Sequence, residues 1–156
     1  MLRIYHQNIC GLWTKTNDLL ASLYPYLSHI LCLTEHHLRQ FQIQHITMDD
    51  YNLCLEFSRQ SFHEGGVCMF IQKYLPYLVI NVEEFCKDKE LEACAVKLDF
   101  LSIKVCIITV YRSPNGNFQY FIKGLDNLIK KIYKPDVQLI ICGDINYLSL
   151  QMDIWK

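Results

Sequence analysis

Six residues of this 156-residue chain have side chains suited to chemistry on phosphate groups. Each follows, directly or within a few residues, a short apolar run of the kind that forms a buried strand. They are Asn8, Glu35, Tyr111, Arg112, Asp144 and Asn146. Because ligands bind α/β sheets beyond the carboxyl ends of the strands, we expect these side chains to gather at one edge of a sheet.

The residue types define the chemistry that such an edge could perform. Asn8 and Glu35 are hard oxygen ligands that suit Mg²⁺, a cation that retains several of its waters. Tyr111 and Arg112 could donate hydrogen bonds to a phosphate, and Asp144 could orient or deprotonate an attacking water. Each residue taken singly is explained better as a turn or cap residue. The four strand ends in this order favour a phosphate-processing site.

The last of these strand ends is the most informative stretch of the chain. The apolar run Leu139–Cys142 predicts a short buried strand, and Gly143 predicts a turn directly after it. Asp144 and Asn146 are two residues apart, so an extended backbone would point both side chains in the same direction. An acid and an amide that project together suit water activation and contact with a phosphate.

Strand, helix and strand alternate at both ends of the chain, which predicts parallel pairing. The first unit comprises a strand over residues 2–8, a helix capped by Thr16 or Asn17, and a strand over residues 30–33. In the second unit, a strand ending at Tyr111 precedes an amphipathic helix over residues 118–132 with Asn117 as its N-cap. The strand over residues 139–142 completes this second unit.

The middle of the chain predicts antiparallel hairpins, and therefore a mixed sheet. Short strands close together in sequence are expected over residues 51–57, 67–71, 77–82, 93–98 and 104–111. A turn is expected near Asp99 to Ser102. With helices at both ends and strands in the middle, the fold class is α/β.

Composition indicates a globular protein, with 51% hydrophobic and 20% charged residues. The formal net charge of −1 argues against purely electrostatic nucleic-acid binding, but it leaves open a nuclease that takes positive charge from a metal ion. The eight cysteines are scattered without a C-x-x-C motif, which predicts reduced core residues. No signal peptide or apolar membrane span is recognisable, so we expect an intracellular protein, nuclear or cytoplasmic, that does not contact membranes.

Five short motifs in order along the chain resemble the endonuclease/exonuclease/phosphatase superfamily, which has the DNase I-like fold. The resemblance is closest to the apurinic-type endonuclease domain of non-LTR (LINE-type) retrotransposons, and it extends from residue 2 to about residue 148. No single motif is specific, but the ordered set is. The motifs cover residues 7–12, 33–38, 65–67, 111–114 and 143–146.

The resemblance implies a four-layer α/β/β/α sandwich and Mg²⁺-dependent nicking of DNA, with Mn²⁺ as the alternative cation. Asn8 and Glu35 match the metal site of that superfamily, and Tyr111 matches its phosphate-contacting tyrosine. Asp144 matches the aspartate that positions the nucleophilic water. By the same resemblance Asn146 would be a catalytic residue beside the scissile phosphate, and Arg112, whose match is weaker, would contact phosphate or DNA.

The pattern departs from the superfamily at its C-terminal end. The superfamily continues to a Ser-Asp-His in which the histidine stabilises charge on the phosphate, and this sequence contains no Ser-Asp-His. We therefore expect residues 1–156 to be a single incomplete domain, the N-terminal portion of the fold, inactive as a fragment. The tail Tyr147–Lys156 is unlike the expected continuation, and the parent reading frame could encode a reverse transcriptase. We also expect the second sheet to be supplied largely by residues after Asn146, leaving strand 105–110 half uncovered.

Three other interpretations stay open at this point. Glu35, His36, His37 and His63 could form a zinc site, although adjacent histidines on one strand point to opposite faces. The chain could also be a non-catalytic remnant or binding module, because the catalytic set is incomplete. Within the superfamily, a phosphatase acting on lipid or nucleotide phosphates is the other enzymatic interpretation.

Overall fold

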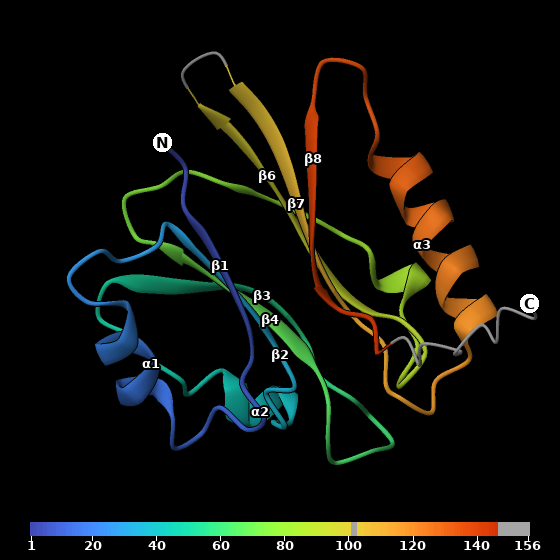
Figure 1. Cartoon of the computed structure of the whole chain (residues 1–156), viewed down its shortest axis with the longest axis horizontal. Coiled ribbons are helices and arrows are strands. Elements are labelled where there is room, and N and C mark those ends of the chain that lie inside the picture. The colour runs from blue at the N-terminus through green and yellow to red at the C-terminus, as the bar shows by residue number, and fades with distance from the viewer. Residues whose placement is uncertain (101–102, 147–156) are drawn as a thin grey trace, which may run out of the picture.

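Two four-stranded sheets packed face to face form the centre of the molecule, and helices cover both outer faces (Figure 1). This computed structural model describes residues 1–100 and 103–146. The end of the turn expected near residues 99–102 and the tail Tyr147–Lys156 lie outside the described residues. From outside to outside, the layers are helix, sheet, sheet and helix, which confirms the predicted four-layer α/β/β/α sandwich.

The first sheet has the strand order β1-β2-β4-β3 and is mixed. The strands are β1 (Ile4–Asn8), β2 (Ile30–Thr34), β3 (Tyr51–Phe57) and β4 (Val67–Gln72). β1 and β2 run parallel because α1 (Thr16–Leu23) crosses between them, whereas β4 pairs antiparallel with both β2 and β3. α1 and the short α2 (Gln40–Ile43) lie on the outer side of this sheet (Figure 1).

The second sheet has the order β5-β6-β7-β8 and is also mixed. Its strands are β5 (Leu78–Ile80), β6 (Glu92–Phe100), β7 (Ile103–Tyr111) and β8 (Gln138–Asp144), and a 3-10 turn, η1 (Glu83–Phe85), follows β5. β7 and β8 are parallel, and α3 (Phe118–Ile132) crosses between them and covers the outer face (Figure 1). Asn117 caps α3 as predicted, since its side chain accepts a hydrogen bond from the Tyr120 N–H at 2.9 Å.

The buried apolar side chains of the described residues form three clusters, one for each contact between layers. One lies between the two sheets and includes Cys32, Met69 and Ile107. A second lies under α1 and α2, and a third joins the second sheet to α3 through Ile108 and Phe121. Strands such as β2 and β7 are apolar on both faces because each face contacts a different layer.

The structure corrects three of the sequence-based expectations. Residues before Asn146 already supply four strands of the second sheet, β5 to β8, and both faces of residues 105–110 are buried. α1 begins at Thr16 and has Lys15 at its N-cap with no side-chain cap, so neither Thr16 nor Asn17 caps it. α2 and η1 were not predicted.

Gly143 is also placed differently, inside β8 and not at a turn. A Cβ atom at this position would lie 1.8 Å from the carbonyl oxygen of Val110 on β7. The glycine is therefore required by the close approach of two strands, and β8 continues to Asp144.

Among the described residues, none of the helices is long and apolar enough to cross a membrane.

Candidate functional site

Four strand ends from both sheets meet at one edge of the sandwich, as the strand order predicted. In the first sheet, the parallel register pairs Asn8 at the end of β1 with Thr34, directly before Glu35. In the second sheet, the parallel register pairs Tyr111 at the end of β7 with Asp144 at the end of β8. Because the two sheets pack face to face, these two pairs of strand ends lie opposite one another.

Hydrogen bonds join four of the predicted side chains across the two sheets. The Asn8 Nδ2 group donates to Glu35 Oε1 at 2.9 Å and to Asp144 Oδ2 at 3.0 Å. The Tyr111 hydroxyl donates to the same Glu35 Oε1 at 2.7 Å. One oxygen of Glu35 is therefore held by both sheets, and the carboxylates of Glu35 and Asp144 share a donor although they are far apart in sequence.

The contacts of Glu35 also set its charge state. Burial acts to raise the pKa of Glu35, but the hydrogen bonds from Tyr111 and Asn8 and the neighbouring His37 outweigh it, so the pKa is lowered. The pKa of Tyr111 is raised by burial and by its hydrogen bond to Glu35. At neutral pH the site thus contains an ionised carboxylate and a neutral phenol that donates to it.

The backbone around Glu35 is held from both sides. Its N–H donates to the Gly66 carbonyl at 2.8 Å, and its own carbonyl accepts from the Gly11 N–H at 2.8 Å. Gly66 has a φ of +87°, and a Cβ at this position would lie 2.3 Å from the His36 Nε2 atom, so only glycine fits. The Gly66 N–H in turn donates to Glu92 Oε2 at 2.6 Å.

A buried ion pair next to the Gly66 loop and the Tyr111 ring stabilises the position of Glu35. Glu92 is fully buried and pairs with Arg59, and the Arg59 guanidinium lies 5.8 Å from the centre of the Tyr111 ring. The pair thus contacts both the glycine loop that holds Glu35 and the tyrosine that donates to it. Sequence reasoning missed this support, because an isolated Arg and Glu 33 residues apart give no local signal.

Arg112 and Asn146 lie beside the site, but their side chains are used within the fold. Arg112 is buried, and its guanidinium donates to the carbonyl oxygens of Ile145, Gly116 and Asn146. The Asn146 Nδ2 group donates to the Arg112 carbonyl oxygen at 2.7 Å. Both side chains thus bond to backbone carbonyls of the fold, and the expected contact of Arg112 and Asn146 with phosphate or DNA stays a prediction.

Asn146 and Asp144 also fail to project together as expected. Asn146 has a φ of +47°, so the backbone is not extended here, and its N–H donates to Asp144 Oδ1 at 3.2 Å. The resulting turn fixes the Asp144 carboxylate, one oxygen by this N–H and the other by Asn8. In this structure, Asn146 is therefore a residue that positions Asp144.

The donor set fits a hard divalent cation only in part. Two carboxylates, Glu35 and Asp144, lie within reach of a single amide group, and such a pair of anions is stabilised by a cation. Asn8, however, presents its NH₂ group to both carboxylates, while its Oδ1 accepts from the Cys10 N–H at 3.2 Å. Asn8 thus links the carboxylates through its NH₂ group, while its oxygen accepts a backbone hydrogen bond.

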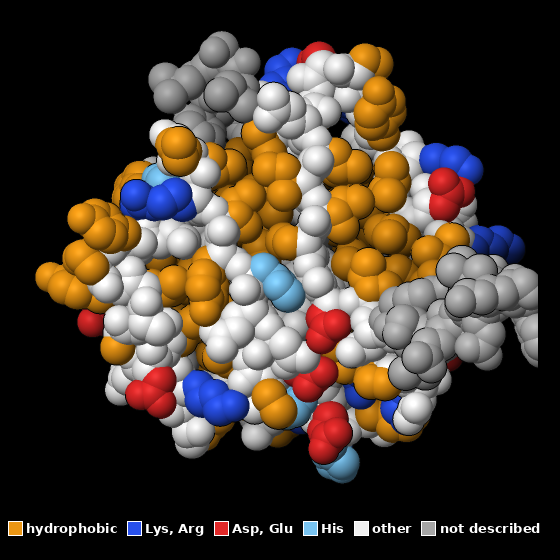
Figure 2. Space-filling view, viewed as in Figure 1, with side chains coloured by type: hydrophobic (Ala, Val, Ile, Leu, Met, Phe, Trp, Pro, Cys, Tyr) orange, Lys and Arg blue, Asp and Glu red, His pale blue; other side chains and the backbone are white. Residues whose placement is uncertain are grey.

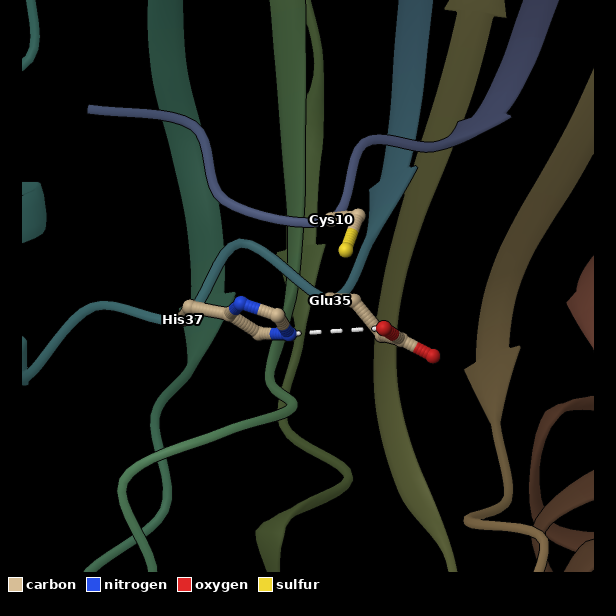
Figure 3. A group of neighbouring side chains, drawn as sticks. All are labelled: Cys10, Glu35 and His37. Atoms are coloured by element: carbon tan, nitrogen blue, oxygen red, sulfur yellow. Dashed lines mark ion pairs between the residues drawn. The ribbon is translucent and has the colours of Figure 1, made fainter. Parts of the chain in front are cut away.

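The histidines and Cys10 are divided between different surroundings. His36 is buried: its Nδ1 accepts from the Leu38 N–H at 3.0 Å, which leaves Nε2–H to donate to the Phe57 carbonyl at 2.9 Å. His63 contacts Arg39 instead, so the predicted grouping of three histidines does not form. His37 lies beside Glu35 and Cys10 (Figure 3). Sequence reasoning assigned Cys10 to the core, although the parallel register of β1 and β2 places it next to residues 35–37.

No protein-family model and no curated protein matches this sequence. Solved structures do match its fold, and the predicted DNase I-like resemblance is confirmed at that level. The chain thus has the DNase I-like fold.

Three of the solved structures illustrate the likeness. The endonuclease domain of TRAS1, a telomere-specific non-LTR retrotransposon, matches with a TM-score of 0.71 and 12% identity over 96% of this chain. D. rerio TDP2 complexed with a single-strand DNA product gives 0.64 and 20% over 94%, and an AP endonuclease from Archaeoglobus fulgidus gives 0.62 and 17% over 92%. This chain spans 61%, 61% and 56% of those three chains, respectively.

Proposed function

We propose that this chain is the N-terminal part of a divalent-metal-dependent phosphodiesterase of the endonuclease type, acting on DNA. One observation carries the proposal: Asn8, Glu35, Tyr111 and Asp144 arrive from four different strands in two sheets and form one hydrogen-bonded group. Turn or cap formation explains each residue singly, but it gives no reason for the four to converge. The DNase I-like neighbours described as endonucleases support the same reading.

In the proposed reaction, the side chains divide into a metal-binding part and a water-activating part. Glu35 is the proposed cation ligand, with Asn8 and Tyr111 holding its carboxylate in place. A divalent cation bound there, Mg²⁺ or Mn²⁺, would polarise a phosphoryl oxygen and offset developing negative charge. Asp144 accepts a proton from the attacking water, and Asn146 fixes the orientation of that carboxylate through its N–H.

The identity of the substrate is also part of the proposal. A net charge of −1 gives the chain little general attraction for nucleic acid, so DNA would be recognised at the site together with its cation. TDP2 bound to a single-strand DNA product and a Neisseria 3′ phosphatase bound to a DNA hairpin have this fold, and both support DNA as the substrate. The second of these is a phosphatase, so hydrolysis of a terminal phosphate is an alternative reaction for the same site.

The fold match also bears on the origin and the extent of the domain. We propose a non-LTR retrotransposon as the source, supported by the fold match to the TRAS1 endonuclease domain. We also propose that the complete domain has further strands and a Ser-Asp-His, because this chain spans 61% of that neighbour. Sequencing the coding region beyond Lys156 tests both, and a reverse transcriptase frame there would support the retrotransposon origin.

Glu35→Gln tests the proposed metal site directly. The substitution keeps the shape of the side chain but removes its charge, so Mn²⁺ affinity should fall at least tenfold. Calorimetry and paramagnetic broadening of nuclear resonances near residue 35 measure it. Glu84→Gln, which changes an exposed carboxylate on η1, is the matched control and should bind Mn²⁺ like the parent. Equal affinity in the parent and in Glu35→Gln would remove Glu35 from the metal site.

Substrate class is tested by comparing three substrates with one preparation of the chain completed by the C-terminal part of a DNase I-like endonuclease. Supercoiled plasmid, a 3′-phosphorylated oligonucleotide and vesicles containing phosphatidylinositol phosphates separate nicking, terminal phosphatase and lipid phosphatase activity. Mg²⁺-dependent conversion of the plasmid to the open circle supports the proposal, and it should be lost in Glu35→Gln. Activity on the vesicles alone would replace the nuclease by the phosphatase interpretation.

A further inference from the structure

A second cluster of potential metal ligands lies on the other side of Glu35 from Asn8. The ligand atoms of Cys10, Glu35 and His37 all lie within 4.8 Å of one another (Figure 3). His37 Nε2 is 3.3 Å from Glu35 Oε2, and in Figure 3 the Cys10 thiol points toward this pair. The three residues come from the two segments that follow β1 and β2.

The two oxygens of Glu35 divide the site into two halves. Oε1 accepts from Asn8 and Tyr111 and faces the oxygen-rich half with Asp144. Oε2 lies 3.3 Å from His37 Nε2 instead, and the Cys10 thiol lies beside this pair. A cation bound at Oε2 therefore meets one sulfur and one imidazole nitrogen, whereas a cation at Oε1 meets only oxygen and amide groups.

The backbone holds the three ligands close together before any metal binds. Cys10, Glu35 and His37 all have left-handed backbone conformations, with φ values of +45°, +56° and +59°. Non-glycine residues seldom adopt this conformation, because the Cβ atom crowds the backbone. The surrounding hydrogen bonds maintain it, from Gly11 N–H to the Glu35 carbonyl at 2.8 Å and from His37 N–H to the Gly65 carbonyl at 2.9 Å.

The Cys10 loop is fixed and open to solvent. The Lys15 Nζ group donates to the carbonyls of Ile9 and Cys10 at 2.8 and 2.7 Å, so the loop keeps its shape without covering the thiol. All eight cysteines lie in the described part of the chain, and Cys10 is the exposed one. The side chains of Glu35 and His37 are 20% and 25% exposed, so an ion can reach all three ligands from water.

The combination of ligands selects the metal. Mg²⁺ takes oxygen ligands, whereas thiolate, imidazole and carboxylate together suit Zn²⁺ and related thiophilic cations. Three protein ligands leave the fourth position of a tetrahedral Zn²⁺ open to water. We propose that Cys10, Glu35 and His37 form a binding site for a thiophilic divalent cation of the Zn²⁺ class.

The shared carboxylate makes this site a regulatory one, a consequence that rests on the proposed function. A Zn²⁺ ion at Oε2 would place a second positive charge next to the proposed Mg²⁺ position. Both cations would then be bound by the single negative charge of the Glu35 carboxylate. Zn²⁺ should therefore oppose Mg²⁺ or Mn²⁺ binding at Glu35. Binding of Zn²⁺ itself does not depend on any catalytic activity of the chain.

Co²⁺ is the probe for the binding site, because it replaces Zn²⁺ and reports its ligands by absorption. Added to the reduced chain, Co²⁺ should give a thiolate-to-metal charge-transfer band and the intense visible bands of a tetrahedral site, and Zn²⁺ should abolish both. Cys10→Ser should lose the charge-transfer band, and His37→Gln should lower Zn²⁺ affinity at least tenfold by calorimetry. Absence of the charge-transfer band in the folded parent would overturn the proposal.

Matched variants separate this site from other cysteines and histidines. Cys86→Ser changes a half-buried thiol beside η1, and His63→Gln changes an imidazole that contacts Arg39; both should bind Co²⁺ like the parent. Circular dichroism confirms that each variant is folded. Loss of the Co²⁺ bands in Cys86→Ser, or their persistence in Cys10→Ser, would assign the metal to a different thiol and overturn the proposal.

The competition between metals is measured separately. Mn²⁺ broadening should decrease as Zn²⁺ is added to the parent. In Cys10→Ser, the Zn²⁺ concentration needed for the same decrease should be at least tenfold higher. If Mn²⁺ does not bind the parent at all, the proposed function fails while the Co²⁺ result still stands. If Mn²⁺ and Zn²⁺ bind together without mutual effect, the shared role of Glu35 in this inference is wrong.

Discussion

β2 and β8 each bring one carboxylate to the site, but from opposite structural surroundings. All five residues of β2 are buried, and the strand pairs with β1 on one side and β4 on the other. Among the described residues β8 pairs with β7 alone, and Ile141 near its middle is 40% exposed. Glu35 therefore follows a central strand, whereas Asp144 ends an edge strand.

The surface reflects the same contrast. Figure 2 shows hydrophobic side chains gathered between β1 and β8 and between β8 and α3, with acidic side chains beyond the lower end of β8. Glu35 is fixed by backbone hydrogen bonds to two neighbouring segments. Asp144 is held by Asn8, by the Asn146 N–H and by its pairing with β7. The proposed metal ligand thus depends on the core, and the proposed base depends on a strand edge.

The largest expected effect concerns Asp144. In a chain completed by the C-terminal part of a DNase I-like endonuclease, Asp144→Asn should lower the rate of plasmid nicking about 10²- to 10⁴-fold, because a general base contributes that much. DNA affinity, measured by fluorescence anisotropy, should change little. Asp126→Asn on the exposed side of α3 is the control. A loss below about tenfold would leave Asp144 with a structural role only.

The next effect tests how tightly β8 must approach β7. In Gly143→Ala, the new Cβ would meet the Val110 carbonyl and force the two strands apart. We expect a loss of about 3 kcal/mol or more in the free energy of unfolding, measured with urea.

Gly124→Ala is the matched control for Gly143→Ala. Gly124 lies within α3, and its new Cβ would meet only the flexible end of the Leu91 side chain. Because alanine also favours the helix, the free energy of unfolding should stay within about 1 kcal/mol of the parent. A Gly143→Ala variant as stable as this control would show that β8 can move away from β7 at little cost.

The convergence of the strand ends could be predicted from the sequence, because parallel strands with crossover helices place their carboxyl ends together. Asn8, Glu35, Tyr111 and Asp144 accordingly lie where the pattern placed them. The assignment of strands to sheets could not be predicted the same way. Residues 105–110 are apolar on both faces, a pattern that shows a covered strand without showing which layers cover it.

The orientation of side chains was the other feature that could not be predicted from the sequence. The resemblance places Arg112 at a phosphate, and in the structure its guanidinium donates to the carbonyls of Ile145 and Asn146 after β8 and of Gly116 in the loop after β7. The first two are tertiary contacts without a local sequence pattern. Cys10 was grouped with the core cysteines because the eight cysteines are scattered without a C-x-x-C motif and most of them lie within apolar runs. Its left-handed backbone turns the thiol outward, and only the structure shows that conformation.

The pH dependence of the free energy of unfolding tests the role of His36, the buried residue that follows β2 and Glu35. Burial lowers the pKa of His36 to about 4, from an ordinary 6.5, and outweighs the hydrogen bond to the Phe57 carbonyl, which acts to raise the pKa. Protonation then favours the unfolded chain, so the stabilisation is complete above pH 6.5 and falls as the pH drops toward 4. Linkage gives a loss of about 3 kcal/mol over this range.

Urea unfolding between pH 7 and pH 4 measures this dependence. His6 and His29, whose pKa values are also lowered by burial, act in the same direction, whereas burial raises the pKa of Glu56 and opposes them. The difference between the parent and His36→Gln isolates the His36 contribution. His45→Gln, at an exposed position, should keep the parent slope. An unchanged slope in His36→Gln would show that residue 36 does not titrate with folding.

The smallest effect on folding stability, and the sharpest test of the edge strand, is expected for Ile141→Lys. Among the described residues, no strand pairs with the second side of β8, where backbone N–H and carbonyl groups lie beside exposed apolar side chains. This combination favours pairing with other chains. We expect the parent to self-associate and bind a hydrophobic dye. A lysine on β8 should shift the population toward monomer in sedimentation velocity while changing the free energy of unfolding by about 0.5 kcal/mol or less. Ile122→Lys replaces an isoleucine of α3 that is 44% exposed, and it should leave the association unchanged. If instead the parent is a monomer that melts cooperatively at ordinary concentrations, the edge of β8 is already protected, and Asp144 is held as firmly as Glu35.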